Sequence, residues 1–235
     1  MLGLGSNIAS IGSHCSVSSF SPEDVSNLQL WLKNNHSLTV AQWDDSSGNG
    51  HHAAQGTSGN QAAVSEGGLD FEGTSNHHYD LANTGVVVSS QEAFIIFIVC
   101  KIESFDNQNS ILGTGDDDIF LEFQTAKKIR FKAGGTAIAI DYPNGTFATG
   151  AKAVFAIQRE AGATGNINLF KNGSAVSPDS QLANAGAITF NVLATRNNDR
   201  FFDGIIHELL CYETANLTSD EITNINNYLT TKHGI

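Results

Sequence analysis

Basic residues are scarce in this 235-residue chain, which has 12 Lys and Arg against 24 Asp and Glu and a formal net charge of −12. Charged residues of both signs make up only 15% of the sequence, and there is no long run of Lys or Arg. Nucleic acids and anionic membranes bind basic surfaces. The composition therefore excludes nucleic acid and membrane as expected partners. Calcium, a neutral glycan and a basic protein remain as candidate ligands or partners.

Long apolar runs are also missing, since none approaches the roughly twenty residues that span a bilayer. The first twenty residues lack a basic start and a continuous apolar segment, so we expect no signal peptide and synthesis in a cytoplasm. Only three cysteines occur, without a CxxC motif. Cys100 and Cys211 lie in apolar strand-like runs, which favours buried free thiols; a Cys100–Cys211 disulfide is the alternative.

The chain divides into an arm and a domain. Residues 1–20 are rich in Gly and Ser, which predicts an extended N-terminal arm. The sequence SPED, beginning at Ser21, is typical of a short helix, with Ser as N-cap, Pro at the first position and acids in the first turn. No linker or internal repeat follows, so residues 21–235 are predicted to form one domain.

Short apolar segments separated by Gly- and Asn-rich turns predict an antiparallel β-sandwich. The expected strands are residues 28–33, 39–43, 68–72, 92–102, 118–124, 127–132, 136–142, 152–159, 166–173, 187–194 and 203–213. The chain then ends in a predicted helix. Thr218 and Glu221 form a capping box, and Gly234 is placed to end the helix. The predicted fold class is all-β with a short N-terminal helix and a C-terminal helix.

Several segments, taken in order, resemble the laminin-G-like branch of the concanavalin A-like lectin/glucanase superfamily. They are LQLWLK, WDDSSGNGHHA, LDFEGTSNHHYDL, FKNGSAV, FFDGIIHELLCYE and the C-terminal LTSDEITNINNYLTTKHGI, and together they run from about residue 28 to 235. The resemblance implies a jelly-roll sandwich of two antiparallel sheets. The start MLGLGSN, followed by SPEDVSNLQLWL, also resembles structural proteins of tailed bacteriophages.

Two stretches invite a metal hypothesis. In WDDSSGNGHH (residues 43–52), an EF-hand loop read from Asp45 would need Glu at its twelfth position, where Gly56 stands, so we interpret the stretch as a turn. Asp116, Asp117 and Asp118 begin a strand, where a loop could bring carboxylates to calcium. Laminin-G-like relatives often hold calcium at a rim loop. Calcium at these three residues is therefore possible, with an acidic solvated turn as the alternative.

Aromatic residues that could stack on a sugar are few. Trp31 and Trp43 both sit in strands, where a core role is expected. Tyr79 and Tyr142 are then the candidate ligand-binding aromatics, from loops. His207, inside GIIHELL, is expected to be a strand histidine rather than a catalyst.

Paired carboxylates suited to glycoside hydrolysis are absent from the sequence pattern. No E-x-D-x-E occurs, and Asp118 and Glu122 are separated by roughly 13 Å if they share a strand face. We therefore expect no enzymatic activity.

The first functional hypothesis is a non-catalytic structural protein of a tailed phage: a capsid decoration, fibre or tail-surface protein at the virion surface. Residues 1–20 would anchor it to a capsid or tail protein within a homo- or hetero-oligomeric assembly, and the sandwich would aid adhesion to host surface glycans. The alternative is a carbohydrate-binding, lectin-like module, with or without calcium. A hydrolase with a degenerate site is a third possibility.

Overall fold

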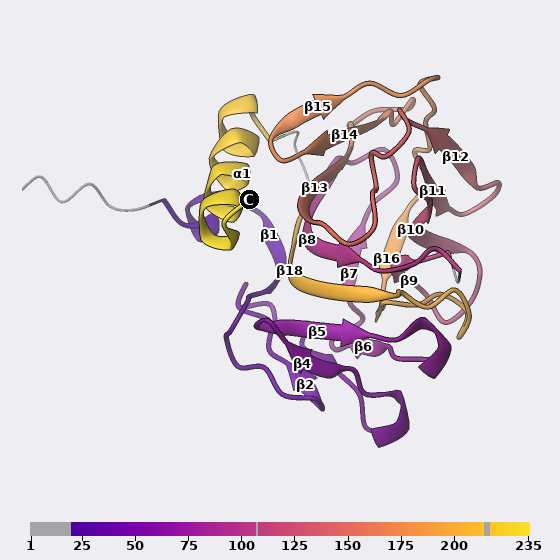
Figure 1. Cartoon of the computed structure of the whole chain (residues 1–235). Coiled ribbons are helices and arrows are strands. Elements are labelled where there is room, and N and C mark those ends of the chain that lie inside the picture. The colour runs from indigo at the N-terminus through magenta and orange to yellow at the C-terminus, as the bar shows by residue number, and fades with distance from the viewer. Residues whose placement is uncertain (1–19, 107, 214–216) are drawn as a thin grey trace, which may run out of the picture.

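Two antiparallel sheets form the molecule in a computed structural model that describes residues 20–106, 108–213 and 217–235 (Figure 1). The first sheet has the order β15 (Ser174–Val176), β14 (Ile167–Lys171), β13 (Lys152–Arg159), β8 (Phe94–Ile102), β18 (Gly204–Glu213), β5 (Gly68–Phe71) and β4 (Ala63–Ser65), and β1 (Leu28–Leu32) also pairs with β18. The second has the order β12 (Ile138–Asp141), β11 (Lys128–Ala133), β10 (Ile119–Thr125), β9 (Ser110–Gly113), β17 (Val192–Leu193), β6 (Tyr79–Leu81), β3 (Ala53–Ala54) and β2 (Gln42–Trp43). A small third sheet pairs β16 (Ile188–Phe190) with β7 (Val86–Val88).

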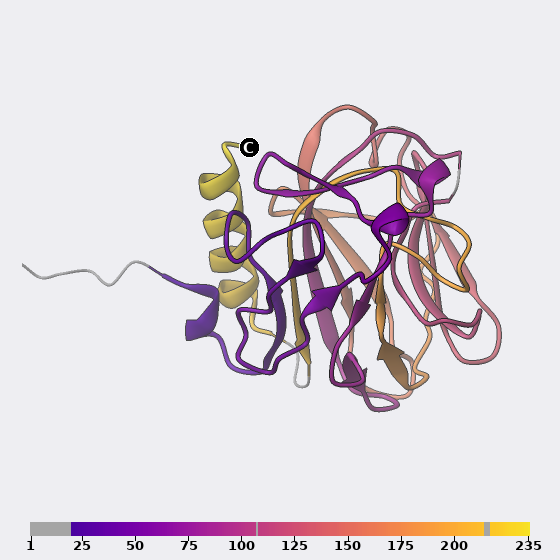
Figure 2. The ribbon, with the colours of Figure 1, turned by 90° about the horizontal axis from the view of Figure 1, so that it is seen from below.

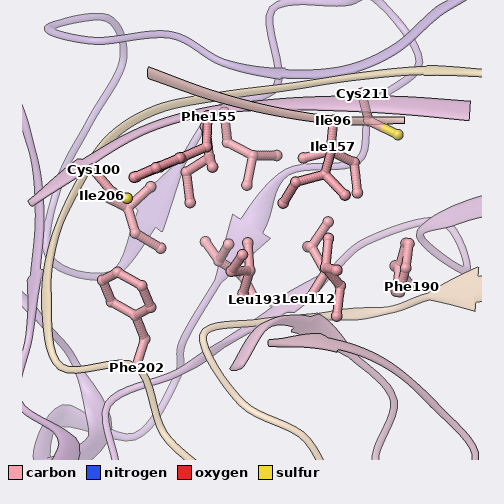
Figure 3. Close-up of a cluster of buried hydrophobic side chains, with 14 of the residues drawn as sticks. Ile96, Cys100, Leu112, Phe155, Ile157, Phe190, Leu193, Phe202, Ile206 and Cys211 are labelled. Carbon is pink, nitrogen blue, oxygen red and sulfur yellow. The ribbon is translucent and has the colours of Figure 1, made fainter. Parts of the chain in front are cut away.

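The main core lies between the two large sheets. Figure 3 shows Ile96, Cys100 and Phe155 of the first sheet facing Leu112 and Leu193 of the second, all of them buried. Interdigitated apolar side chains removed from water are the main stabilising contribution in such a sandwich. The predicted two-sheet, all-β fold is confirmed.

A second apolar cluster covers the other face of the first sheet. α1 (Ser219–His233) lies beside β1 and β18 (Figure 1), and its Ile222, Ile225 and Leu229 pack against Phe97 and Leu210. Because β8 is thus buried on both faces, its sequence from Phe94 to Cys100 is continuously apolar instead of alternating.

The predicted short N-terminal helix and the predicted C-terminal helix are both confirmed. The 3₁₀ helix η1 (Pro22–Asp24) has Ser21 as N-cap, and α1 has the Thr218–Glu221 capping box and Gly234 in the left-handed conformation at its end. Two further 3₁₀ turns, η2 (Ser58–Asn60) and η3 (Gly73–Ser75), lie between strands. Figure 2 shows η1 and α1 on the same side of the molecule. Within the described residues, no helix is long and apolar enough to cross a membrane.

Cys100 and Cys211 are buried free thiols, as predicted. In the pairing of β8 with β18, Cys211 lies opposite Ile96, four residues from Cys100. Four strand residues span roughly 13 Å, well beyond the Cα separation of about 7 Å that a disulfide tolerates. Burial raises the pKa of both thiols above the ordinary value.

Two predicted strands were drawn too long. Residues 39–43 are a strand only at Gln42 and Trp43, because Thr39 bonds Gln42 across a tight turn, with the Thr39 N–H donating to the Gln42 carbonyl at 2.8 Å. Residues 187–194 divide into β16 and β17, which belong to different sheets. The predicted arm, residues 1–20, lies outside the described residues except for Phe20.

Candidate functional site

An open groove with a volume of about 710 Å³ runs along one edge of the sandwich. We call it the edge groove. Its walls come from the segment after β1, from β2 and from β4, and β2 and β4 are each the last strand of their sheet. The lining residues are Asn35, Ser37, Leu38, Thr39, Ala41, Gln42, Asp44 and Val64. The groove therefore forms where both sheets end.

Hydrogen bonds to neighbouring segments fix the part of the chain that forms one wall of the edge groove. The Trp43 indole Nε1 donates to the Lys33 carbonyl at 3.0 Å, and the Asn35 N–H donates to the Gly67 carbonyl at 2.8 Å. Asn35 and Ser37 have φ of 56° and 44°, a left-handed conformation that is uncommon outside glycine. The hydrogen bonds to Lys33 and Gly67 hold the segment in this conformation.

Tyr79 links two walls of the edge groove through its hydroxyl group. Its hydroxyl accepts a hydrogen bond from the Ala62 N–H at 3.0 Å and donates to the Val40 carbonyl at 2.7 Å. Ala62 directly precedes β4, and Val40 lies between the lining residues Thr39 and Ala41. The ring itself is fully buried, and burial raises the pKa of Tyr79 to about 12. The prediction that Tyr79 offers a surface to a ligand is therefore wrong, because its hydroxyl positions the groove instead.

Tyr142, the second predicted aromatic, is also unavailable to a ligand. It is 1% exposed and packs edge-on against Phe147, with ring centroids 5.9 Å apart. The predicted core positions of Trp31 and Trp43 are confirmed, since neither is exposed.

The polar side of the edge groove centres on Asp44. Gln42 Nε2 donates to Asp44 Oδ1 at 2.5 Å, and the Thr39 hydroxyl accepts the Gln42 N–H at 3.0 Å. His52 Nδ1 lies 3.4 Å from the same carboxylate oxygen. That nitrogen already accepts the Asp45 N–H at 3.1 Å, so it carries no proton to donate to Asp44. The half-exposed Asp44 carboxylate thus keeps acceptor capacity for a ligand.

The rest of WDDSSGNGHH is a turn, as the sequence analysis concluded. The buried Asp45 carboxylate accepts the backbone N–H groups of Trp31 at 2.9 Å and His51 at 3.0 Å. It also accepts the Ser47 hydroxyl at 2.8 Å. Asp45 therefore ties the turn to β1 and leaves Asp44 facing the edge groove.

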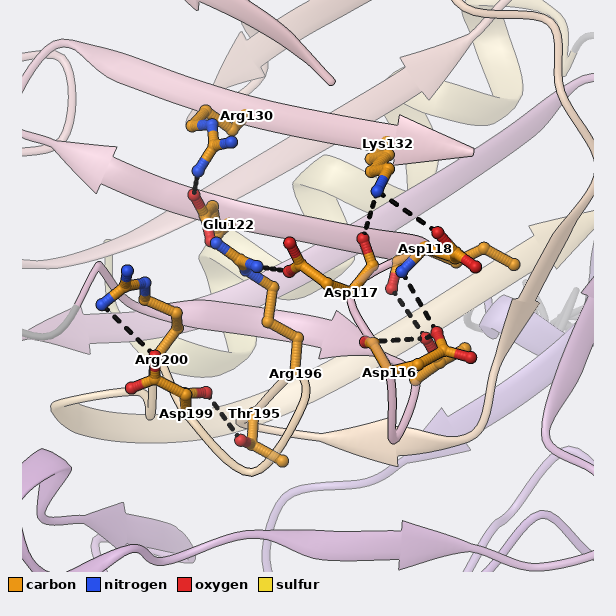
Figure 4. A network of polar contacts seen from close by, with 12 residues as sticks. Asp116, Asp117, Asp118, Glu122, Arg130, Lys132, Thr195, Arg196, Asp199 and Arg200 are labelled. Atoms are coloured by element: carbon orange, nitrogen blue, oxygen red, sulfur yellow. Dashed lines mark hydrogen bonds and ion pairs between the residues drawn. The ribbon is translucent and has the colours of Figure 1, made fainter. Parts of the chain in front are cut away.

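Asp116, Asp117 and Asp118 form ion pairs and turn contacts and do not converge on one point (Figure 4). Asp117 pairs with Arg196, and Asp118 pairs with Lys132 at 3.3 Å. Asp116 accepts the Thr114 hydroxyl at 2.6 Å, and this hydrogen bond holds its pKa below the ordinary value. Within residues 20–106, 108–213 and 217–235, no three His, Cys, Asp or Glu side chains are grouped to hold a metal ion.

Below these aspartates lies Glu122, a fully buried carboxylate on β10. Arg130 Nη1 contacts it at 3.0 Å, and Arg196 Nε donates to it at 2.8 Å. Loss of hydration raises the pKa of Glu122 to about 7 against the lowering effect of Arg130. Both guanidinium groups also stack on Phe120, at 5.1 and 4.0 Å from the ring centroid.

On the opposite side of the molecule, the buried Glu208 of β18 anchors the C-terminal helix. It accepts the Trp31 indole N–H at 2.7 Å and the Lys232 ammonium at 2.8–2.9 Å, and it contacts His233 Nε2 at 2.7 Å. These hydrogen bonds outweigh the effect of burial and lower its pKa. Beside it His207 is a fully buried strand histidine, and burial lowers its pKa to about 4. Its Nε2 lies 3.8 Å from Glu66 Oε2, and among the described residues its ring nitrogens make no hydrogen bond.

The edge groove itself was not foreseen. Asp44 was assigned only to the turn, and Asn35, Ser37, Thr39 and Gln42 were not singled out. The only local signal is the polar stretch between residues 34 and 39, which reads equally well as a solvated loop.

Two packed antiparallel sheets and a terminal helix define an all-β sandwich fold. Among solved structures, a sialidase from Trypanosoma rangeli matches 88% of this chain and 33% of its own, with 15% identity and a TM-score of 0.57. This chain thus spans about a third of the sialidase.

Domain 4 of AbnA, a GH43 extracellular arabinanase from Geobacillus stearothermophilus solved in complex with arabinotriose, matches 85% of this chain and 98% of its own, with 18% identity and a TM-score of 0.52. The botulinum neurotoxin type G receptor binding domain matches 87% of this chain and 52% of its own, with 15% identity and a TM-score of 0.50. No protein-family model and no curated protein matches the sequence. At such identities the likeness concerns the fold.

Proposed function

We propose that this chain is a non-catalytic, lectin-like module that binds carbohydrate in the edge groove. The observation that carries the proposal is the chemistry of the lining, in which five hydrogen-bonding side chains alternate with Leu38, Ala41 and Val64. Sugars present hydroxyl groups around apolar C–H faces, and a groove of this size with a few convergent polar groups suits such a ligand. The fold likeness to domain 4 of AbnA, solved with arabinotriose, is consistent with this proposal.

The absence of catalysis is part of the proposal. Glu122 and Glu208 lie in different sheets, and each is held by cationic side chains. A glycosidase needs two carboxyl groups within about 5–9.5 Å on either side of the scissile bond. The lining of the edge groove contains a single carboxylate, Asp44. This favours binding over hydrolysis.

A glycan array probed with the full chain, with and without calcium, tests the proposal. We expect binding that Asp44→Asn and Gln42→Ala weaken and that Asp179→Asn leaves unchanged. Asp179 is an exposed acid whose N–H bonds Asp141 of β12, at the other end of the second sheet, so it matches the charge change away from the groove. An array without any binder, or binding indifferent to both groove variants, would remove the proposal.

A second candidate is the virion structural protein of a tailed phage, in the laminin-G-like branch and exposed on the particle surface. Sequence resemblance supports it, together with the start of the domain: Phe20 packs edge-on against Tyr228 of α1, with ring centroids 6.4 Å apart. This contact places Phe20, the last residue of the predicted arm, against α1. Deleting residues 1–19 should abolish particle binding and leave the melting temperature unchanged. Retained particle binding would contradict this candidate.

A further inference from the structure

We infer that the edge groove selects uncharged sugars and rejects acidic ones, because its lining contains one carboxylate and no base. This inference rests on the proposed function. Asp44 is the only charged residue among the eight that line the groove. The Lys or Arg nearest in sequence, Lys33, points elsewhere: its Nζ lies 4.3 Å from the centroid of the Trp31 ring, which packs in the cluster beneath α1.

The Asp44 carboxylate is the acceptor for sugar hydroxyls. One oxygen takes the Gln42 amide, and in the described part of the chain the other takes no hydrogen bond. A carboxylate accepts two neighbouring hydroxyl groups with both oxygens, and hydrogen bonds to a charged group are stronger than those to a neutral one. A vicinal diol therefore gains most from Asp44.

An acidic sugar meets the same carboxylate as a like charge. No cation in the lining offsets that repulsion, and the net charge of −12 on the whole chain adds to it. The cations of the second sheet do not help, because Arg130, Lys132 and Arg196 are already paired with acids on β10 and the loop before it. Charge thus discriminates against uronic, sialylated and sulfated glycans.

The apolar contribution comes from aliphatic side chains. Val64 lines the groove and Val40 flanks it, and they are 47% and 46% exposed. They can cover the C–H face of a sugar ring, but no aromatic ring lines the groove to stack on it. Each site therefore binds weakly, and tight attachment needs several copies of the chain on one glycan.

The test uses matched oligosaccharide pairs: neutral gluco-, galacto- and xylo-oligosaccharides, and hexose oligosaccharides of equal length oxidised at C6 to uronates. Ligand-observed NMR or calorimetry with the full chain measures affinity. We expect each neutral hexose oligosaccharide that binds to do so at least tenfold more tightly than its uronate. Asp44→Asn should weaken neutral binding about tenfold and bring the neutral-to-uronate ratio close to one, whereas Asp179→Asn should change neither.

The outcomes separate this inference from the proposed function. Uronates that bind as tightly as their neutral partners would overturn the selectivity and leave carbohydrate binding intact. A ratio unchanged by Asp44→Asn would overturn the role of Asp44. No binding to any oligosaccharide on the panel would remove the proposed function as well.

Discussion

Two buried groups on opposite sheets should give the stability of this protein opposing dependences on pH. Glu122 has a pKa raised from 4.5 to about 7, and His207 has a pKa lowered from 6.5 to about 4. Both side chains are fully buried, so solvent does not screen them. At about 1.4 kcal/mol per pH unit, each group changes the free energy of unfolding by about 3 kcal/mol.

The two effects have opposite signs. Between pH 4.5 and 7 the folded state keeps a proton on Glu122 that the unfolded chain has released, so stability falls as pH rises through this window. Between pH 4 and 6.5 the unfolded chain keeps a proton on His207 that the folded state lacks, so stability rises with pH. Where the windows overlap, the contributions nearly cancel in the native protein.

Single variants should expose each contribution. Glu122→Gln removes the Glu122 effect, so from pH 4.5 to 7 its free energy of unfolding should rise relative to that of the native protein by about 3 kcal/mol. His207→Leu removes the His207 effect, so from pH 4 to 6.5 its free energy of unfolding should fall relative to that of the native protein by about 3 kcal/mol. Either variant can also lower stability at every pH, so the slope with pH is the readout.

Urea unfolding at a series of pH values, followed by the fluorescence of the buried Trp31 and Trp43, gives these slopes. The double variant is the control: it should lack both contributions and keep only the pH dependence of the other titrating groups, such as His77. The lowered pKa of Glu208 affects all four proteins alike below about pH 4.5 and does not disturb the comparison. If Glu122→Gln runs parallel to the native protein, Arg130 and Arg196 keep Glu122 ionised and the reasoning about its desolvation is refuted.

Three further changes test other parts of the structure. Tyr79→Phe removes the hydroxyl that hydrogen-bonds to both Ala62 and Val40. Denaturant unfolding should show that the free energy of unfolding falls by about 1–2 kcal/mol, and glycan affinity should fall with it. Unchanged glycan affinity would show that Tyr79 does not position the edge groove. Glu208→Gln leaves Lys232 and His233 without their carboxylate partner, so the free energy of unfolding should fall by about 3 kcal/mol. Amide hydrogen exchange should increase first in α1. Exchange in α1 as slow as in the native protein would show that Glu208 does not anchor this helix. Millimolar calcium should give the same melting temperature as EDTA, because Asp117 and Asp118 are paired with Arg196 and Lys132. A melting temperature that rises with calcium, and no longer does so in Asp116→Asn, would instead establish the calcium site considered from the sequence.

Features that depend on a short window of residues were predictable. Ser21 as N-cap and the capping box of Thr218 with Glu221 depend on neighbouring residues, and the apolar stripe of α1 follows helical spacing. The apolar composition around Cys100 was enough to predict a buried thiol. Strand limits were less accurate, because the turn from Thr39 to Gln42 and the division of β16 from β17 depend on which neighbour each residue pairs with.

The candidate site was predicted poorly because exposure is set by distant segments. Tyr79 and Tyr142 look like loop aromatics in sequence, and both are covered by chain that packs over them. Glu122 meets Arg196 from 74 residues further along the chain, which no local pattern indicates. Asp116–Asp118 looked like metal ligands because the sequence does not show that Arg196 and Lys132 reach them.

By itself, the sequence determined the all-β class, the two helix ends, the core tryptophans and the acidic character of the chain, because hydrophobic periodicity, capping and charge are local or summed properties. Tertiary structure alone decided that β2 and β4 end their sheets side by side around one groove, and that Asp44 faces it without a cation. The reason is that a groove between two sheet edges exists only after strands far apart in sequence have paired. The same strand pairing decides which carboxylates lie next to a Lys or Arg side chain.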